Sequence, residues 1–147
     1  MAGATQTYEG GCHCGSVRFR IEADLSELTR CTCSMCTKKG MLGCYVPAQQ
    51  FHLLQGESEL TLYQFNTRVA KHFFCRNCGI HAFMNPRSNP RAFAINARCL
   101  DNFDLDARQY ETKVFDGRNW EAAQEARLTS ARLESASPTR APHPPAE

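Results

Sequence analysis

The sequence predicts a mainly β domain whose small antiparallel sheets are held together by bound metal. Apolar and polar residues alternate from Val17 to Ile21, which is the period of a strand with one buried face. No long amphipathic helix pattern occurs before about residue 119. Seven of the nine cysteines fall into three tight clusters, a distribution typical of metal sites in a reducing compartment.

The expected secondary structure consists of short strands followed by one helix. After the run at 17–21, a second and less regular strand is expected over Leu60 to Phe65. Further short runs are rich in aromatic and branched residues and are bounded by glycine, proline or asparagine; they cover 51–54, 73–74, 82–84, 92–97 and 112–115. Alanine, glutamate, glutamine and arginine dominate 121–133 and indicate a C-terminal helix.

These patterns divide the chain into three parts. A flexible N-terminus is expected over 1–7, one zinc-binding domain over 8–120, and a helical and then disordered tail over 121–147. The 147 residues suffice for one hydrophobic core. The end of the tail, from Ser135, contains four of the seven prolines and no large apolar residue, so it cannot bury enough surface to become ordered.

Charge and hydropathy exclude several classes of partner. Seventeen basic and fifteen acidic residues give a net charge of +2, which is too balanced for nucleic acid or an anionic membrane to be the main partner. No apolar run reaches the roughly 18 residues that a membrane-spanning helix needs. The first residues also lack the basic start and apolar stretch of a secretory signal. We therefore expect a cytoplasmic protein.

The strongest local motif is Cys75-Arg-Asn-Cys78-Gly79. A Cys-x-x-Cys turn directs two sulfurs at one metal ion, and the glycine that follows permits the positive φ of such a turn. A redox dithiol has the same spacing, but it requires a βαβ context and a helix after the first cysteine. The glycine and the strand-like residues before the motif favour metal binding.

A second hook, Gly11-Cys12-His-Cys14-Gly15, supplies two more sulfurs. In a regular strand these two side chains would point to opposite faces, but the flanking glycines allow the backbone to bend. The pair at Cys75 and Cys78 is the natural complement. Together they predict a closed site of four cysteines that joins the first strand to the middle of the domain.

The third cluster, Cys31-x-Cys33-Ser34-x-Cys36, offers three sulfurs within six residues. Ser34 can cap a short turn whose N–H groups face the metal. Three protein ligands and one open position are typical of a catalytic zinc. The alternative is a structural site in which Cys44, Cys99 or a histidine supplies the fourth ligand.

The order of the three clusters resembles the glutathione-dependent formaldehyde-activating family, which includes the centromere protein V group. The resemblance rests on Gly-Gly-Cys12-His-Cys14-Gly, Cys31-x-Cys33-Ser-x-Cys36 and Phe74-Cys-x-x-Cys78-Gly, and it extends to the segment Phe115-Asp-Gly-Arg-Asn-Trp120. It implies a tent-like, mainly β fold with two zinc ions per chain. By position, Cys12, Cys14, Cys75 and Cys78 match the structural zinc ligands, and Cys31, Cys33 and Cys36 match the catalytic ones.

The resemblance also implies a carbon–sulfur lyase activity, in which a small thiol such as glutathione combines with an aldehyde such as formaldehyde. In this hypothesis the substrate thiol occupies the open position beside the three cysteines and adds, as a thiolate, to the carbonyl carbon. Basic side chains would hold the carboxylates of the substrate; the candidates are Arg87, Arg91 and Arg98. His81 is a further candidate for contact with the substrate or the second metal, although a structural role is the simpler interpretation.

Two other functions compete with the enzyme. The first is an interaction module of the kind that the centromere protein V group suggests, but the mixed charges of 121–147 disfavour tight binding of nucleic acid. The second is a non-catalytic zinc-binding scaffold or zinc reservoir. An iron–sulfur cluster is a further possibility for a site of four cysteines.

Overall fold

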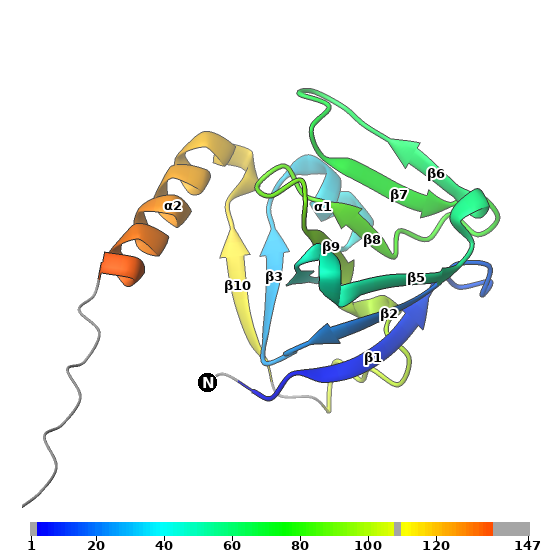
Figure 1. Ribbon diagram of the computed structural model, residues 1–147. Helices are drawn as coiled ribbons and strands as arrows, with labels where there is room; N and C mark the ends of the chain where they lie inside the picture. The colour runs from blue at the N-terminus through cyan, green and yellow to red at the C-terminus, as the bar shows by residue number, and fades with distance from the viewer. Residues whose placement is uncertain (1–2, 108–109, 137–147) are drawn as a thin grey trace, which may run out of the picture.

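The computed structural model describes residues 3–107 and 110–136, and its strands form two sheets (Figure 1). The smaller sheet has three strands, in the order β1 (Gln6–Gly11), β2 (Arg18–Ala23) and β5 (Phe51–Gln55). The larger sheet has seven strands, in the order β10 (Glu111–Phe115), β3 (Glu27–Cys31), β4 (Gly43–Val46), β9 (Phe93–Asn96), β8 (Phe83–Asn85), β7 (Lys71–Cys75) and β6 (Leu60–Tyr63).

Helical elements are few and short in the described chain. The two α-helices are α1 (Ser34–Lys39) and α2 (Trp120–Ala136). Four single 3₁₀ turns cover Ala48–Gln50, Glu57–Glu59, Ala97–Cys99 and Gly117–Asn119. None of the described helices is long and apolar enough to cross a bilayer.

The mainly β prediction is confirmed, with one difference in strand direction. Every strand pair is antiparallel except β10 and β3, which run parallel with Glu111 opposite Glu27. A parallel pair requires a long connection between its strands, and here almost the whole domain separates the two. Local patterns therefore cannot reveal this pairing.

Strands that the hydrophobic pattern predicts occur at each expected place, but β1, β3 and β4 were not expected. The sequence Gln-Thr-Tyr-Glu-Gly-Gly of β1 has one large apolar side chain, Tyr8, and three of its six residues are exposed. Its place in the sheet depends on full antiparallel pairing with β2, from Gln6 opposite Ala23 to Gly11 opposite Arg18. The backbone amide of Gly3 also donates to Asp24, at 2.7 Å.

The core lies between the two sheets. Phe19 and Ile21, on the inner face of β2, are fully buried, as is Ile95 of β9. Each such side chain contributes about 1.5–3 kcal/mol on burial. The ring of Phe51 stacks on that of Phe93 at 4.1 Å between centroids, which joins β5 of the small sheet to β9 of the large one.

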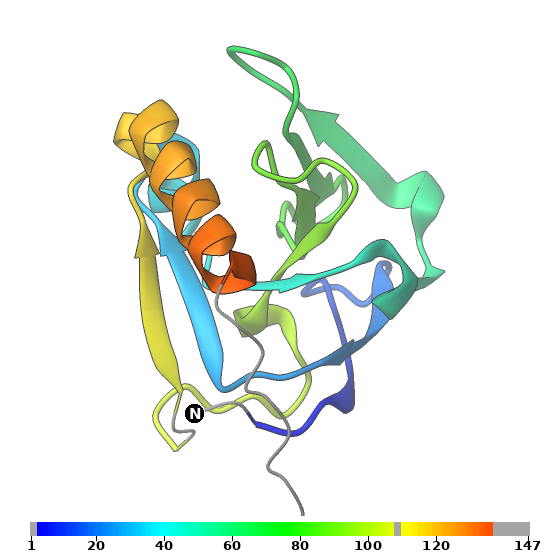
Figure 2. The ribbon, with the colours of Figure 1, turned by 60° about the vertical axis from the view of Figure 1, so that its left-hand side comes forward.

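Helix α2 follows β10 and stands beside the sheets rather than within the core (Figures 1 and 2). A groove of about 740 Å³ separates it from β4 and β10. Gln124 and Arg127 of α2 both donate to the carbonyl oxygen of Ser88, at 3.3 and 3.1 Å. The helix extends through Ser135, where the disordered tail was expected to begin; residues 137–147 of that tail lie outside the described residues.

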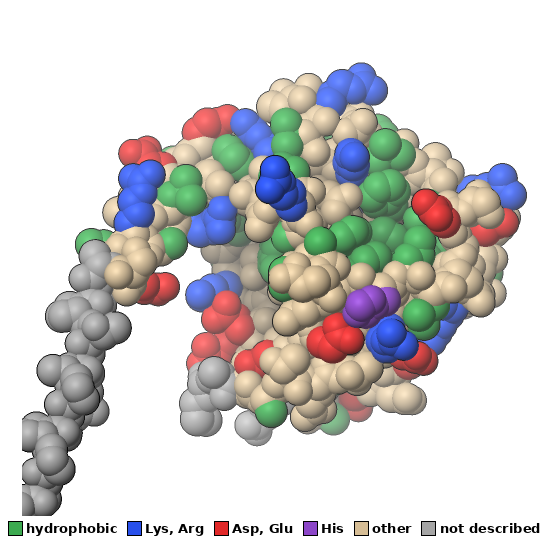
Figure 3. Space-filling view, viewed as in Figure 1, with side chains coloured by type: hydrophobic (Ala, Val, Ile, Leu, Met, Phe, Trp, Pro, Cys, Tyr) green, Lys and Arg blue, Asp and Glu red, His purple; other side chains and the backbone are tan. Residues whose placement is uncertain are grey.

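Acidic and basic side chains are interspersed over the face of the molecule in Figure 3. Two ion pairs connect such residues across strands or loops, Arg18 with Asp101 and Arg76 with Glu59, and His52 Nε2 lies 3.2 Å from Glu22 Oε2. This pairing agrees with the low net charge of the chain.

Candidate metal centres and active site

Two hooks from different sheets bring four cysteine sulfurs together. The Sγ atoms of Cys12, Cys14, Cys75 and Cys78 all lie within 4.8 Å of one another. Cys14 Sγ is 3.6 Å from Cys12 Sγ and 3.7 Å from Cys75 Sγ. The first hook connects β1 to β2, and the second follows β7, so a metal ion here would join the small sheet to the large one.

Glycines shape both hooks as the sequence predicts. Gly15 and Gly79 have φ values of 83° and 77°, in the left-handed region that glycine occupies without steric cost. The Gly79 amide donates to the Cys75 carbonyl oxygen at 2.7 Å, which closes the second turn. In the first hook the Val17 amide donates to Cys12 Sγ at 3.2 Å.

Hydrogen bonds favour the thiolate at Cys14 and Cys78, whereas burial raises the pKa of Cys75 to about 11. The hydroxyl of Ser16, 3.1 Å from Cys14 Sγ, is the main cause of a lowered pKa at Cys14. Burial acts to raise the pKa of Cys78, but backbone N–H groups of Cys14 and Ile80 lower it to about 6. Four converging sulfurs with N–H donors match the ligand set of a structural zinc site.

The second cluster forms where β3 meets α1. The Sγ atoms of Cys31, Cys33 and Cys36 also lie within 4.8 Å of one another. Cys33, not Ser34, is the N-cap residue of α1, and its sulfur accepts from the Cys36 amide at 3.3 Å. The Cys33 amide in turn faces Cys31 Sγ at 3.5 Å. The helix start thus places two sulfurs on one side and supplies donors to them.

The three sulfurs influence one another strongly. Hydrogen bonds from Cys31 and then Cys36 lower the pKa of Cys33 to about 2, whereas the pKa of Cys36 is raised by its contacts with Cys31 and Cys33 and by burial. Three thiolates at this spacing would repel one another unless a cation neutralises them. Sulfur ligands in this number select a soft or borderline metal such as zinc.

No fourth ligand joins this group from the histidines, cysteines and carboxylates of residues 3–107 and 110–136. Cys44 is buried and Cys99 half-buried, and burial raises the pKa of each thiol to about 11. A raised pKa keeps both as protonated thiols, which are poor metal ligands. The alternative in which one of them completes the second site has no support in the geometry.

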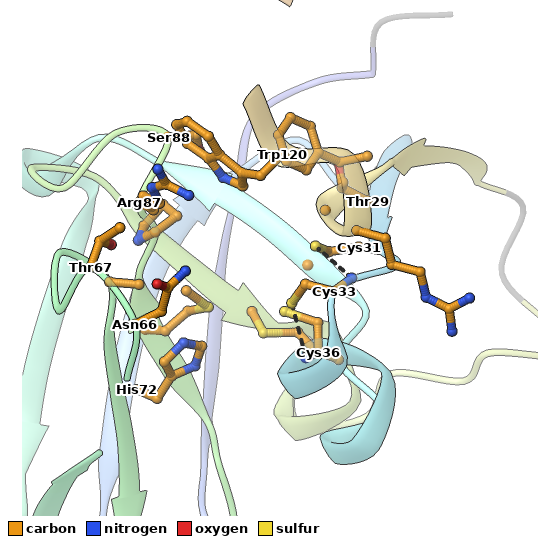
Figure 4. Close-up of a pocket in the computed structure, with 18 of the residues that line it drawn as sticks. Thr29, Cys31, Cys33, Cys36, Asn66, Thr67, His72, Arg87, Ser88 and Trp120 are labelled. Atoms are coloured by element: carbon orange, nitrogen blue, oxygen red, sulfur yellow. Dashed lines mark hydrogen bonds between the residues drawn. The ribbon is translucent and has the colours of Figure 1, made fainter. Parts of the chain in front are cut away.

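A cavity of about 230 Å³ opens directly on the three sulfurs (Figure 4). On the side opposite the cysteines it is bounded by His72 of β7 and by Asn66 and Thr67 of the loop after β6. Trp120, the first residue of α2, and Arg87 close its upper part. The lining therefore combines one strongly polar wall with aromatic and aliphatic surface.

The three arginines that the sequence offers as substrate-binding residues lie in different places relative to the cavity. Arg87 lines the cavity; its guanidinium lies 3.6 Å from the centroid of the Trp120 ring and 3.2 Å from Glu121 Oε1. Arg91 is exposed on the same loop but does not line this cavity. Arg98 is also exposed and lines a separate depression together with Cys31 and Cys36. Thus Arg87 alone of the three faces the cavity.

His81 is half-buried and does not line the cavity either. Its ring lies 5.2 Å from that of Phe74, and its Nδ1 is buried without a hydrogen-bond partner among the described residues. Burial, followed by the charge of Lys39, lowers its pKa to about 4. Its backbone carbonyl accepts from Asn96 Nδ2 at 3.3 Å. The structure therefore places the His81 ring beside Phe74 and outside the cavity.

Other residues at the cavity were not singled out by the sequence patterns. Gly117 packs so closely on the cluster that a Cβ atom there would lie 2.5 Å from Cys31 Sγ. His72 is buried, and its Nδ1 lies 3.1 Å from Lys39 Nζ. Gly117 belongs to the segment Phe115–Trp120 to which the family resemblance extends, but the sequence assigned it no role at the site. A lone histidine in an apolar strand carries no such signal.

Comparisons with known proteins agree with this geometry. The family model described as "Glutathione-dependent formaldehyde-activating enzyme" matches residues 7–117. A crystal structure of a protein from Rhodobacter sphaeroides is 35% identical in sequence, with a TM-score of 0.66. The alignment covers 71% of this chain and 99% of that one. The region that the family model matches contains both cysteine groups and ends before α2. The chain belongs to the glutathione-dependent formaldehyde-activating enzyme family.

Proposed function

We propose that this protein is a zinc-dependent enzyme that joins the sulfur of a small thiol, such as glutathione, to the carbonyl carbon of an aldehyde, and that it catalyses the reverse carbon–sulfur cleavage. The observation that supports this proposal most directly is the second cysteine group. Its three sulfurs open on a cavity, and no fourth ligand comes from the described chain. A purely structural zinc site is closed by four protein ligands.

Each cysteine group has a separate part in the proposal. Cys12, Cys14, Cys75 and Cys78 would hold a structural zinc, and Cys31, Cys33 and Cys36 a second one. Bound there, zinc would favour the thiolate form of a substrate thiol that reaches it. The cavity of about 230 Å³ is smaller than the roughly 300–1,000 Å³ of a site for a whole drug-sized ligand. We therefore expect it to enclose only the reacting end of the substrate.

The rest of the thiol substrate would lie at the mouth of the cavity, beside Arg87. This guanidinium already pairs with the highly exposed Glu121, so a substrate carboxylate can replace that partner in the same geometry. The face of Trp120 holds the guanidinium in place. These contacts support a thiol that carries a carboxylate, as glutathione does.

The nine cysteines are free, which fits a reducing location, and we propose the cytoplasm. The mixed charges of the described surface give no support to nucleic acid as a partner. A zinc-binding scaffold without activity remains the competing function, and the test below separates the two.

The test combines metal counting with measured adduct formation. Protein purified without added metal should contain two zinc ions per chain, and glutathione should raise its melting temperature because it binds the folded state. With ¹³C-formaldehyde and glutathione, exchange spectroscopy should show that the protein accelerates formation of the S-hydroxymethyl adduct. Two zinc ions without acceleration for any thiol would indicate a scaffold. A single zinc ion, held by the four-cysteine group, would refute the catalytic proposal.

A further inference from the structure

His72 is a buried histidine in the wall of the cavity that faces the three sulfurs. It lies in β7, is 2% exposed and lines the cavity together with Cys31, Cys33 and Cys36. Figure 4 shows its ring beneath Asn66, across the cavity from the cysteines. The ring nitrogens of His72 do not lie close enough to all three sulfurs to bind the same metal ion. Space for a substrate atom therefore remains between them.

The two ring nitrogens of His72 have different surroundings. Nδ1 faces Lys39 Nζ of α1 at 3.1 Å. Nε2 has no hydrogen-bond partner among the described residues. It is not fully enclosed by protein atoms and keeps some accessible surface. Because His72 lines the cavity, Nε2 is the ring nitrogen that we assign to contact with a substrate there. The ring of Phe65, 5.6 Å away between centroids, packs against the imidazole and restricts its rotation.

Lys39 determines which nitrogen carries the proton. Burial lowers the pKa of Lys39, and the charges of the three nearby cysteines oppose that shift. While Lys39 is charged it has three donors and no acceptor, so Nδ1 of His72 accepts and the single proton of the neutral ring is on Nε2. Burial, followed by the charge of Lys39, lowers the pKa of His72 to about 4, so the ring is neutral at physiological pH. Lys39 itself lies beside Met84 Sδ, at 3.8 Å, and has no carboxylate partner among the described residues.

We propose that His72 is a catalytic residue whose Nε2–H donates a hydrogen bond to the carbonyl oxygen of the aldehyde, and that Lys39 is the positioning residue that fixes this tautomer. The inference rests on the proposed thiol–aldehyde addition and names the group that would stabilise the developing negative charge. A donor that is already oriented in a cavity needs no reorganisation as the charge develops.

The proton balance of the step does not require His72 to titrate. The substrate thiol loses its proton to solvent before the addition. The new carbon–sulfur bond forms with the sulfur lone pair, and the π electrons of the carbonyl move onto oxygen. That oxygen, held by Nε2–H, then takes a proton from water and becomes the hydroxyl of the product. His72 has the same protonation before and after.

Two substitutions at His72 test the proposal in the full-length, zinc-loaded protein. His72→Phe removes the donor but keeps a ring next to Phe65, and we expect kcat with glutathione and formaldehyde to fall about 10²- to 10³-fold. His72→Gln places an amide N–H near the position of Nε2 and should retain kcat within about tenfold. The matched control is His52→Phe. It removes a half-buried histidine of β5 whose ring lies next to Glu22 of β2. It should leave kcat unchanged, and all three variants should retain two zinc ions.

The tautomer provides a readout that does not depend on activity. Ring ¹⁵N chemical shifts of His72 should show a protonated Nε2 and an unprotonated Nδ1, and Lys39→Met should yield a mixture of tautomers. A wild-type ring protonated on Nδ1 would overturn the proposal, as would unchanged kcat in His72→Phe while the wild type is active. An inactive wild type would instead refute the thiol–aldehyde reaction itself, and the role of His72 with it.

Discussion

Thr32 Oγ1 donates a hydrogen bond to Asp116 Oδ1 at 2.7 Å, across 84 positions of sequence. The same threonine donates its backbone amide to the Phe115 carbonyl oxygen, and its own carbonyl oxygen accepts from Arg118 Nε at 3.1 Å. The end of β10 and the turn after it are thus fastened to the loop that presents Cys31 and Cys33. The family resemblance ends in this segment, and the contacts show why it belongs to the site.

Removing this connection should weaken the second metal site. Asp116→Ala removes the hydrogen bond that holds Thr32 of this loop. Mutation of residues that support metal ligands typically lowers metal affinity about 10- to 100-fold. We expect a corresponding loss of zinc affinity at the three-cysteine site, measured by competition with a chelator. Glu125→Ala, at an exposed position of α2, is the control and should leave affinity unchanged. Equal affinities in both variants would show that the loop needs no such anchor.

A methyl group at Gly117 should displace the same loop. In Gly117→Ala the Cβ atom would lie 2.5 Å from Cys31 Sγ and 3.0 Å from the Cys33 amide nitrogen, closer than such atoms can pack. We expect occupancy to fall from two zinc ions per chain to about one. Gly40→Ala is the comparison, because its Cβ meets nothing within 4 Å and only its φ of 65° opposes the substitution. It should cost about 1 kcal/mol of stability and retain both metal ions.

The two cysteine groups should respond differently to loss of one sulfur. Cys75→Ser breaks the site that joins the sheets, and because metal binding at such sites contributes directly to folding, we expect no cooperative thermal transition. Cys33→Ser should abolish turnover and leave one zinc ion per chain with a largely intact fold. Metal analysis and thermal unfolding of both variants test this. Global unfolding of Cys33→Ser would show that the second site is structural.

Arg87 should determine the preference for an acidic thiol. Arg87→Ala removes the cation at the mouth of the cavity, and we expect KM for glutathione to rise about tenfold, because an interaction worth about 1.4 kcal/mol is lost. KM for an uncharged thiol should change little. Arg91→Ala, on the same loop but outside the cavity, should have a smaller effect on KM for glutathione. Similar effects of both substitutions would show that Arg91 also contributes to binding the substrate carboxylates.

Burial of His72 should make stability depend on pH. Its pKa is about 4 in the folded chain and about 6.5 when unfolded, so between these values the unfolded chain binds more protons. The free energy of unfolding must then fall as pH decreases from 7.5 to 5, by about 1–2 kcal/mol for this residue.

The pH effect can be isolated by difference. Urea unfolding of the wild type and of His72→Phe, with zinc in excess, should give a stability difference that varies with pH over this range. The pH dependence of the unfolding free energy that remains in His72→Phe would include the contribution of His81, whose pKa is lowered in the same way. A difference that is constant between pH 7.5 and 5 would contradict the low pKa of His72.

The sequence was informative where spacing alone constrains the structure. The partition of seven cysteines into groups of four and three follows from motif spacing, and the structure brings together the same two groups. The strands with strong alternation, such as β2, were also predictable, because one buried face imposes a period of two. The C-terminal helix was expected from composition, and it starts one residue earlier than predicted, at Trp120.

Weak or remote determinants escaped this reasoning. Strand β4 contains Gly43, Cys44 and Tyr45 and shows no regular alternation; its position follows from pairing with β9. The parallel pairing of β10 with β3 depends on a contact between distant parts of the chain. In both cases the stabilising partner is remote in sequence, so no local window contains the information.

What the sequence determined by itself was the chemistry: how many sulfurs are available, how they are grouped, and which turns glycine allows at Gly15 and Gly79. Tertiary structure decided which side chains share a cavity with those sulfurs. It placed Arg87 and Trp120 at the mouth, left Arg91 outside, and brought Lys39 of α1 against His72 of β7. The physical reason is that metal ligands within one turn are constrained by bond lengths and spacing, whereas a cavity forms from strands and loops that meet only when the two sheets pack.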